Sequence, residues 1–357
     1  MNAPVLIMAG GTGGHVFPAL AVAGELHRRG HEVHWLGSTS GIENRLVPDN
    51  GYPLHVLHIS GVRRAGPGRL LMLPARLLSS LLSALRVVRR LRPGLAVGFG
   101  GFASGPGGVA ARLLGIPLLV HEQNAVAGLT NRLLARIATR TLEGFSGSFG
   151  GRGIMVGNPV RQDIATLEPP ETRYANRSGP LRIQVLGGSQ GALALNRDLP
   201  GALAQVFAGR ELRIHHQAGS GRVNEAAPAY EAAGLEAQVS EFIDDMAQAY
   251  AQADLVICRA GALTVAEVAV AGVAAVFVPL PTAVDDHQSR NAAWLAQADA
   301  ARVLPQAQLD ADGLARALEG MEEREALGRM AARARAMAIP DSAVRVADLC
   351  EEVMHGG

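Results

Sequence analysis

Residues 5–37 read VLIMAGGTGGHVFPALAVAGELHRRGHEVHWLG, and this stretch decides the fold. An apolar run ends in a glycine-rich turn, a helical pattern of small residues follows, and a second apolar run closes the stretch. Apolar runs without alternation are typical of strands that are buried on both faces, as in parallel sheets. A helix between two such strands supplies the right-handed crossover that a parallel pair needs. The stretch therefore predicts strand, turn, helix and strand at the start of an α/β domain.

The same order of elements returns later in the chain. Residues 181–219, LRIQVLGGSQGALALNRDLPGALAQVFAGRELRIHHQAG, repeat the pattern of residues 5–37. Residues 253–281 repeat the strand, glycine-rich turn, small-residue helix and strand of residues 95–124. Two matched sets of α/β units predict two doubly wound parallel-sheet domains in tandem.

Prolines and polar residues cluster at residues 157–180, where we expect the domain boundary. We place an N-terminal Rossmann-like domain at residues 1–160 and a C-terminal one at residues 161–337. The last segment, about 338–357, is helical by its periodicity. It can pack back on the N-terminal domain or on the C-terminal one.

Composition excludes several classes of protein. The formal net charge is +1, so no global charge recruits nucleic acid, and no zinc-finger spacing is present. The start, MNAPVLIMAGG, lacks the basic region and long apolar core of a signal peptide, and no stretch reaches about 18 uninterrupted apolar residues. We expect Cys258 and Cys350 to be reduced thiols of a cytosolic protein. The chain contains no lysine, which excludes a GxxxxGK[ST] phosphate loop and a lysine Schiff base.

The two GG-x-x-G turns are candidate anion sites. Such a turn lies at the carboxyl edge of a parallel sheet, where α/β proteins bind ligands, and the helix that follows offers free N–H groups to a diphosphate. A tight turn with no ligand is the alternative. A nicotinamide dinucleotide site also requires an acid at the end of the second strand, and neither HEVHWLGSTS nor RIHHQAGSGR provides one.

Several polar side chains are candidates for chemistry, each with a structural alternative. His15 follows the first turn and can act as a general base or cap a helix. Glu267 in CRAGALTVAE can accept hydrogen bonds from ribose hydroxyls or favour a helix dipole. Gln288 and Asn291 in DDHQSRNA can bind sugar hydroxyls or belong to a solvated helix start.

Asp310 and Asp312 form a D-x-D spacing within QLDADGLARAL. This pattern indicates a helix cap, and we reject the two aspartates as a metal site.

Residues 50–121 contain no acidic residue but carry Arg63, Arg64, Arg69, Arg76, Arg86, Arg89, Arg90, Arg92 and Arg112. This segment includes a leucine-rich helical pattern. The residues expected to face a core are Leu70, Leu77, Leu81, Leu85 and Val88, and those that widen the apolar surface are Leu71, Leu78 and Leu82. Such a helix can rest on an anionic bilayer or pack on a core with solvated arginines.

Taken together, the motifs resemble the MurG family of glycosyltransferases. They are GGTGGHVFPALAVA, GSTSGIE, GFGGFASGP, HEQNAVAGLTNR, GNPVR, GGSQGA, EFIDDM, CRAGALTVAE and DHQSRNA, in that order along nearly the whole chain. The resemblance implies a GT-B fold, in which two Rossmann-like domains face a cleft. It also implies metal-independent, inverting transfer of N-acetylglucosamine from UDP-N-acetylglucosamine to lipid I, giving lipid II for peptidoglycan, without a cofactor. It further implies a peripheral position on the cytoplasmic face of the inner membrane, with anionic phospholipid and other cell-wall synthesis proteins as partners.

The resemblance also implies roles for individual residues. His15 would be the base. The substrate-binding set would be Thr12, Gly13, Gly14, Asn124, Arg161, Ser189, Ile243, Ala262, Leu263, Thr264, Val265, Ala266, Glu267 and Gln288. Within this set Ser189 would bind the diphosphate, the Ile243 backbone the uracil edge and Glu267 the ribose. Gln288 would hold sugar hydroxyls, with Asn291 as the alternative. A UDP-N-acetylglucosamine epimerase on the same fold and a non-catalytic nucleotide-binding scaffold are the other functions that the sequence leaves open.

Overall fold

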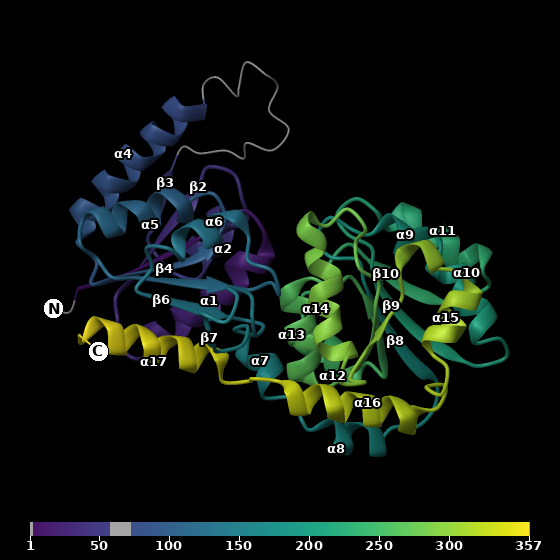
Figure 1. Ribbon diagram of the computed structural model, residues 1–357. Coiled ribbons are helices and arrows are strands. Elements are labelled where there is room, and N and C mark those ends of the chain that lie inside the picture. Colours follow the sequence, from purple (N-terminus) through teal and green to yellow (C-terminus); the bar gives the residue numbers. More distant parts are fainter. Residues whose placement is uncertain (1–2, 58–72, 357) are drawn as a thin grey trace. The chain divides into compact units, whose positions relative to one another are not determined.

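The computed structural model describes residues 3–57 and 73–356, and the chain divides into two compact units. Unit 1 comprises Met1–Arg161 with Ile339–Gly357, and unit 2 comprises Gln162–Ala338. Each unit contains one parallel sheet with helices packed on it (Figure 1). The prediction of two doubly wound parallel sheets is therefore confirmed.

Unit 1 is built on a seven-stranded sheet in the order β3-β2-β1-β4-β5-β6-β7. Its strands are β1 (Val5–Ala9), β2 (Val33–Ser38), β3 (Leu54–Leu57), β4 (Leu95–Gly100), β5 (Leu118–Glu122), β6 (Arg140–Glu143) and β7 (Ile154–Met155). Its helices are α1 (Gly13–Arg28), α2 (Glu43–Asp49), α4 (Leu73–Leu91), α5 (Ser104–Leu113), α6 (Leu129–Leu134) and α17 (Ser342–Met354).

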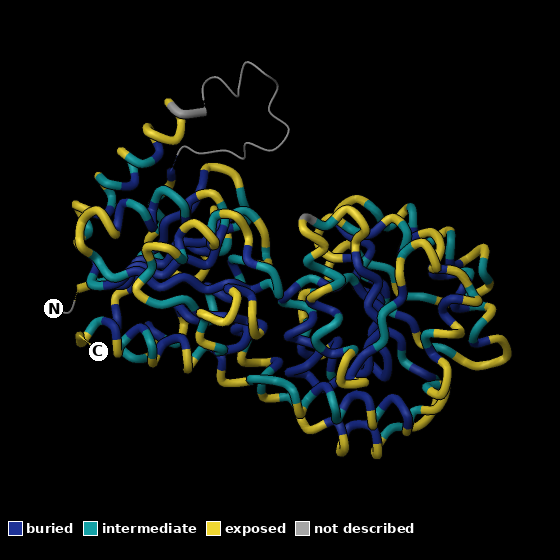
Figure 2. The backbone as a smooth tube through the Cα atoms, viewed as in Figure 1, coloured by how far each residue is buried: buried dark blue, intermediate teal, exposed yellow. Residues whose placement is uncertain are grey.

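Strands β1, β4 and β5 of unit 1 are buried along their whole length, as their unbroken apolar runs predict, whereas the outer strands β3 and β7 are partly exposed (Figure 2). Val5 and Ile7 of β1 belong to a core that includes residues of α1 and α17. Leu6 and Met8 alternate with them and belong to a second core that includes residues of α4 and α5. Because successive side chains of a strand point to opposite faces, one short apolar strand supplies both cores.

The C-terminal helix α17 packs on α1 within unit 1. Arg29, the C-cap residue of α1, donates hydrogen bonds to Asp348 and Glu351 at 2.7 Å each, and His31 contacts Glu351 at 2.8 Å. Buried Cys350 lies in the shared core and is a free thiol, as is buried Cys258 of unit 2. The tail of the chain therefore completes the first domain rather than the second.

Unit 2 is built on a six-stranded sheet in the order β10-β9-β8-β11-β12-β13. Its strands are β8 (Leu181–Leu186), β9 (Leu212–Gln217), β10 (Ala237–Ser240), β11 (Leu255–Cys258), β12 (Ala274–Phe277) and β13 (Arg302–Val303). Its helices are α7 (Gln162–Ala165), α8 (Pro170–Ala175), α9 (Leu193–Arg197), α10 (Leu199–Val206), α11 (Val223–Ala232), α12 (Met246–Gln252), α13 (Ala262–Ala271), α14 (His287–Ala296), α15 (Ala311–Ala317) and α16 (Arg324–Met337), with 3-10 turns η1 (Val284–Asp286) and η2 (Gln306–Gln308).

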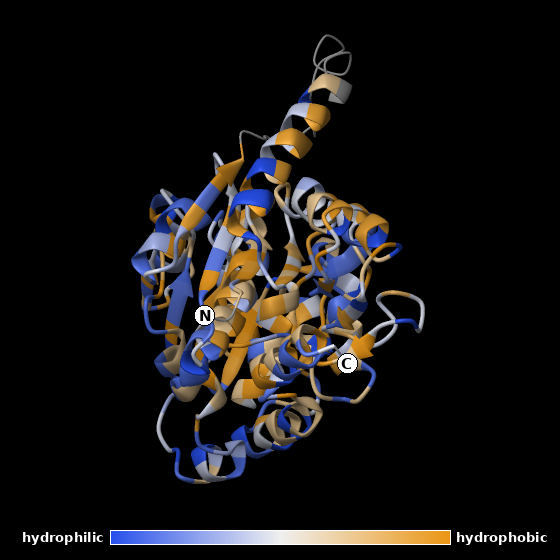
Figure 3. Cartoon of the chain, turned by 90° about the vertical axis from the view of Figure 1, so that its left-hand side faces the viewer, coloured by the Kyte–Doolittle hydropathy of each residue, from blue (hydrophilic) through white to orange (hydrophobic). Residues whose placement is uncertain are grey.

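Helix α4 forms where the leucine-rich pattern predicts it, and Figure 3 shows apolar and hydrophilic residues side by side along it. Leu81 and Leu85 pack on the core, but Leu77 is 48% exposed. The prediction that Leu77 faces the core is wrong, because the apolar side chains of α4 that join this core, among the described residues, are Leu81 and those after it. Predicted core residue Leu70, its neighbour Leu71, and Arg63, Arg64 and Arg69 lie outside the described residues. Among the described residues, no helix combines the length and the apolar character needed to cross a bilayer.

The loops after β1 and β4 touch through their backbones. Gly101 has φ +85°, and a Cβ atom on it would collide with the carbonyl oxygen of Gly10. Only glycine allows both the left-handed conformation and this approach.

We predict that Gly101→Ala destabilises the chain by at least about 2 kcal/mol, because it adds a backbone collision to the ~1–2 kcal/mol cost of the left-handed conformation. Gly115→Ala is the matched control, since Gly115 has φ +74° and a Cβ atom added to it would meet open space within 4 Å. Urea unfolding of both variants measures the difference. Equal losses of stability would show that the contact between the two loops is unimportant.

Candidate functional site

The first glycine loop, between β1 and α1, is shaped by a buried carboxylate that the sequence analysis did not single out. Glu43 of α2 has no exposed surface. It accepts hydrogen bonds from the Gly11 N–H at 2.9 Å and from the N–H and hydroxyl of Ser38 at 3.1 and 2.7 Å. Its carboxylate lies against Gly10 and Gly41, where a Cβ atom would displace it. The loop therefore packs around a buried carboxyl group, and the Gly11 N–H is already engaged.

The helix start that follows this loop remains open to a ligand. Thr12 is the exposed N-cap residue of α1 in an extended conformation, and its side chain does not cap the helix. Gly13 and Gly14 begin the helix, so their N–H groups have no partner one turn earlier in it. The three predicted loop residues thus lie where an anion can meet backbone donors.

The run His121–Asn124 extends across the end of β5 and carries a second buried carboxylate. Glu122 is 1% exposed. It accepts hydrogen bonds from the backbone and side chain of Asn124 at 2.9 and 3.1 Å, from the Gly128 N–H at 3.0 Å and from Asn131 at 2.9 Å. The predicted ligand residue Asn124 is therefore held in place by Glu122, two residues earlier in the chain.

His15 is half-buried on the first turn of α1, and its Nδ1 lies 2.7 Å from the Oε1 atom of Gln123. Gln123 in turn contacts His121, which is fully buried. Burial lowers the pKa of His121 to about 4, so this imidazole is neutral near pH 7. The predicted base is thus tied to the strand β5 through a buried amide.

In unit 2 the loop after β8 holds Ser189, which is exposed between Gly188 at φ +80° and Gly191 at φ +71°. The Ser220 N–H donates to the Ser189 carbonyl at 3.2 Å. Gly219 lies so close to Gly191 that a Cβ atom on it would collide with the Gly191 backbone. The edge of this sheet therefore repeats the close backbone approach seen in unit 1.

Glu267 lies on α13, whose first residue follows Gly261 in an extended conformation. The carboxylate is 8% exposed and accepts a hydrogen bond from the Tyr250 hydroxyl at 3.0 Å. Burial, and then the nearby Glu267 charge, raise the pKa of the Cys258 thiol, which therefore stays protonated near pH 7. This carboxylate lies in the second turn of α13, not in its first turn, and is oriented by a buried tyrosine.

The two candidate amides on α14 have different environments. Asn291 is fully buried and donates to the Ala260 carbonyl at 3.1 Å, which ties α14 to the loop after β11. Gln288 is half-buried, and its Oε1 accepts a hydrogen bond from the Leu280 N–H at 2.9 Å. Of the two, Gln288 is the side chain that a ligand can reach.

The predicted residues fall into two groups, each within one unit. Thr12, Gly13, Gly14, His15 and Asn124 follow β1 and β5, at the carboxyl edge of the sheet of unit 1. Ser189, Ile243, Ala262–Glu267 and Gln288 follow β8, β10, β11 and β12, at the carboxyl edge of the sheet of unit 2. Arg161 is half-buried and is the last residue of the first segment of unit 1.

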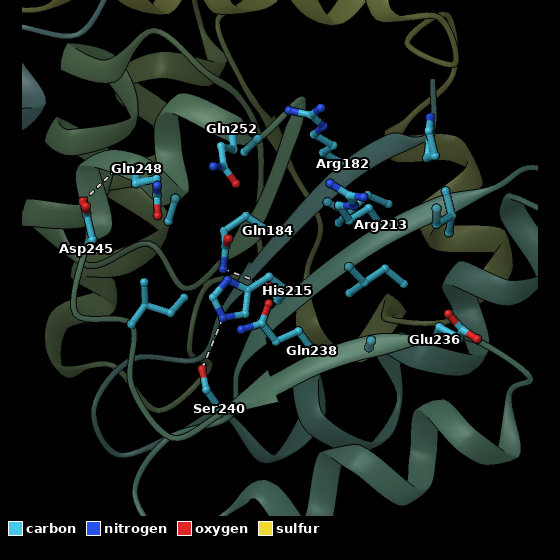
Figure 4. Close-up of a pocket in the computed structure, with 18 of the residues that line it drawn as sticks. Arg182, Gln184, Arg213, His215, Glu236, Gln238, Ser240, Asp245, Gln248 and Gln252 are labelled. Atoms are coloured by element: carbon cyan, nitrogen blue, oxygen red, sulfur yellow. Dashed lines mark hydrogen bonds between the residues drawn. The ribbon is translucent and has the colours of Figure 1, made fainter. Parts of the chain in front are cut away.

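Unit 2 also has a polar hollow of about 870 Å³ on the face of β8, β9 and β10, which the sequence analysis missed (Figure 4). Gln184 donates to the His215 carbonyl at 2.9 Å, and the His215 ring contacts the Ser240 hydroxyl at 3.3 Å. Alternating polar residues in β8 and β9, such as Arg182 and Gln184, were the signal for it. The hollow includes Ile243 in its lining, but the residues of the loop that carries Ser189 do not line it.

Asp310 is the N-cap residue of α15, and its carboxylate accepts a hydrogen bond from the Gly313 N–H at 2.8 Å. The prediction that this D-x-D sequence caps a helix is confirmed.

Comparison with known proteins agrees with this architecture. Residues 5–143 match the model of the glycosyltransferase family 28 N-terminal domain, and residues 182–346 match that of the family 28 C-terminal domain. A protein of Alcanivorax borkumensis is 60% identical over 357 residues, which are 100% of both chains. That relative is named UDP-N-acetylglucosamine--N-acetylmuramyl-(pentapeptide) pyrophosphoryl-undecaprenol N-acetylglucosamine transferase.

Two solved structures are also similar. The crystal structure of MurG from Acinetobacter baumannii has a TM-score of 0.85 and 46% identity, covering 98% of this chain and 99% of that one. The UDP-GlcNAc 2-epimerase of Neisseria meningitidis, bound to UDP-GlcNAc, has a TM-score of 0.70 but only 10% identity, over 98% of this chain and 100% of that one. The second likeness is one of fold alone.

We predict that two buried histidines make the folded chain less stable in mild acid. Burial lowers the pKa of His121 and of His216 to about 4 each. In the unfolded chain the two imidazoles bind protons near pH 6.5, but in the folded chain they do so only near pH 4. The stability of the folded chain is therefore not reduced by these histidines above about pH 6.5, and it decreases as the pH falls from 6.5 towards 4. We expect the free energy of unfolding to fall by about 2 kcal/mol per histidine between pH 7 and pH 5.

Urea unfolding across this pH range measures the slope, and His216→Gln should reduce it. His355→Gln, at an exposed histidine, is the control. An unchanged slope in His216→Gln would contradict the prediction.

Proposed function

The chain belongs to glycosyltransferase family 28, and we propose that it transfers N-acetylglucosamine from UDP-N-acetylglucosamine to the muramyl 4-hydroxyl of undecaprenyl-diphospho-MurNAc-pentapeptide, lipid I, with inversion at the anomeric carbon. The product is lipid II, the precursor for peptidoglycan synthesis. The observation that carries the proposal is 60% identity along the whole chain to a relative whose name describes this transfer. The epimerase alternative has only a likeness of fold in its support.

The leaving UDP carries diphosphate charge that the protein must stabilise. Because the chain has no lysine, we assign this role to backbone N–H groups and helix N-termini. In unit 1 the donors are those of Thr12, Gly13 and Gly14, since Gly11 already donates to Glu43. In unit 2 they are those of the loop that carries Ser189 and those of Ala262, Leu263 and Thr264 at the start of α13. Val265 and Ala266 follow in the same helix, and the Val265 N–H already donates to the Gly261 carbonyl at 2.9 Å. We assign no metal to the reaction.

The rest of the donor is assigned to polar groups at the same edges. The Ile243 backbone takes the uracil edge, Glu267 the ribose hydroxyls and Gln288 the hydroxyls of the transferred sugar. Carboxylate and amide oxygens suit these roles because they accept hydrogen bonds from hydroxyl groups. Asn124 and Arg161 are the remaining residues that we assign to binding of the donor.

His15 is assigned as the general base. The muramyl 4-oxygen bonds to C1 of the sugar while the C1–O bond to UDP breaks, and the hydroxyl proton passes to the imidazole. The proposed base thus lies on the first turn of α1, at the carboxyl edge of the sheet of unit 1.

Transfer of labelled N-acetylglucosamine to a lipid I analogue, with and without EDTA, tests the function directly. We expect labelled lipid II in both conditions. Incubation with UDP-N-acetylglucosamine alone tests the alternative, because an epimerase would change the sugar without an acceptor. Epimerised sugar without transfer, or UDP binding with neither reaction, would overturn the proposal.

We predict that Glu267→Gln raises the KM for UDP-N-acetylglucosamine by about 10-fold to 100-fold, the range for losing a hydrogen bond to a charged group. The KM for lipid I should stay within about twofold. Tyr250→Phe is the matched control, because it removes the partner hydroxyl and leaves the carboxylate. Steady-state kinetics with each substrate varied measure both values, and equal effects on the two KM values would exclude a ribose contact.

We also propose that unit 1 rests on the anionic surface of the cytoplasmic leaflet as a peripheral protein. Leu77, Leu78 and Leu82 of α4 are 48%, 56% and 45% exposed. Arg86, Arg89 and Arg90 are exposed on the same helix. Leu113 of α5 and the α6 residues Leu129 and Leu133 are also exposed, and α5 packs against both α4 and α6. Exposed leucines beside arginines suit a membrane surface, because the leucines can contact the acyl chains and the arginines the anionic headgroups.

Charge reversal of Arg86, Arg89 and Arg90 to glutamate should weaken binding to anionic vesicles at least tenfold at low salt, since each basic residue contributes about 1 kcal/mol near such a surface. The difference should shrink as salt is added. Reversal of the exposed unit 2 residues Arg197, Arg210 and Arg316 is the control for net charge. Vesicle sedimentation measures binding, and equal losses for the two triple variants would refute docking through α4.

A further inference from the structure

A chain of hydrogen bonds links His15 to a buried backbone carbonyl of unit 1. His15 Nδ1 lies 2.7 Å from Gln123 Oε1, and Gln123 Nε2 lies 3.0 Å from His121 Nδ1. Gln123 Nε2 also donates to the His121 carbonyl at 2.9 Å, and His121 Nε2 lies 2.9 Å from the Gly157 carbonyl. Two groups in this series of hydrogen bonds, the carbonyl oxygens of His121 and Gly157, can only be acceptors.

These carbonyls determine the direction of every bond between them. His121 Nε2 carries a hydrogen, because it faces the Gly157 carbonyl, and in a neutral ring Nδ1 is then an acceptor. Gln123 Nε2 donates both to this Nδ1 and to the His121 carbonyl, so the opposite end of the amide, Oε1, faces His15. An amide oxygen cannot donate, so His15 Nδ1 carries a hydrogen. In neutral His15 the lone pair is then on Nε2.

The surroundings keep this arrangement rigid. Gln123 is 1% exposed, and its own carbonyl accepts a hydrogen bond from Asn158 at 2.9 Å. The His121 ring stacks on Phe99 with 5.3 Å between ring centroids. Gly100 lies against the His15 ring, because a Cβ atom there would be 2.9 Å from its Cε1 and 3.0 Å from its Nδ1. The two rings and the amide thus have little freedom to exchange partners.

We propose that Gln123 is a positioning residue that holds His15 as the Nδ1–H tautomer and so presents the Nε2 lone pair to the acceptor hydroxyl. The catalytic part of this proposal rests on the proposed function, in which His15 is the base. The 4-hydroxyl proton moves to Nε2 as its oxygen bonds to the sugar. The proton stays on His15, because the His121 nitrogen that faces Gln123 is occupied by the amide N–H. A neutral amide fixes the tautomer without adding a negative charge beside the leaving diphosphate.

The tautomers are measurable in the free protein, without any substrate. Long-range ¹H–¹⁵N correlation spectra of the full chain with labelled histidine, at pH 8, distinguish the two neutral forms, and His15→Ala assigns the His15 signal. We expect His15 as Nδ1–H and His121 as Nε2–H. Gln123→Leu should turn His15 into a mixture with substantial Nε2–H and lower kcat about 10-fold to 100-fold, the scale of general base catalysis. The KM for UDP-N-acetylglucosamine should stay within about twofold.

Gln184→Leu is the matched control, since it removes another buried glutamine, in unit 2, and should change neither readout. His15 found as Nε2–H in the native chain, or unchanged by Gln123→Leu, would overturn the positioning role. A changed tautomer with full turnover in both Gln123→Leu and His15→Ala would overturn its catalytic part. If the native chain shows the expected tautomers but makes no lipid II, the proposed function fails while the tautomer assignment stands.

Discussion

The close approach of backbones at the carboxyl edge of each sheet is the constraint on which the rest of the structure depends. In unit 1 Gly101 lies against Gly10, and in unit 2 Gly219 lies against Gly191, with no space for a Cβ atom in either pair. This contact draws the loops of neighbouring strands together. In unit 1 it holds the loop that leads into α1, with the free N–H groups of that helix start, against the loop after β4, and in unit 2 it holds the loop that carries Ser189 against the loop after β9. A side chain at Gly101 or at Gly219 would separate the two loops at the edge of its own sheet.

Buried carboxylates support these edges in unit 1. Glu43, Glu122 and Glu143 are 0%, 1% and 2% exposed, and each accepts hydrogen bonds from backbone N–H groups of a glycine-containing loop. A buried polar group is tolerated when hydrogen-bond partners surround it, so each of these carboxyl groups both requires and fixes the loop that donates to it. The consequence for function is specific. Glu43 occupies the Gly11 N–H, so an anionic ligand must use the donors that follow it in the loop.

Much of the fold followed from local pattern. The unbroken apolar runs at residues 5–9 and 181–186 predicted parallel strands, and the repeated turn predicted two domains of the same kind. Other features required tertiary contacts. Leu77 lies on the same side of α4 as Leu81, one turn earlier, yet Leu77 is 48% exposed and only Leu81 packs on the core. Asn291 and Gln288 are equivalent as amides, but burial against the Ala260 carbonyl engages Asn291.

The sequence by itself determined the α/β class, the repeated glycine turns, the absence of lysine and the resemblance to a glycosyltransferase family, because these depend on residue type and spacing along the chain. Only the tertiary structure decided that Glu43 fills the first loop, that α17 completes unit 1 and that Gln123 orients His15. These contacts join residues separated by 32 positions for Gly11 and Glu43, 108 for His15 and Gln123 and 322 for Arg29 and Glu351. The direction of a hydrogen bond and the occupant of a buried space are set by what surrounds them in three dimensions, and no local pattern records it.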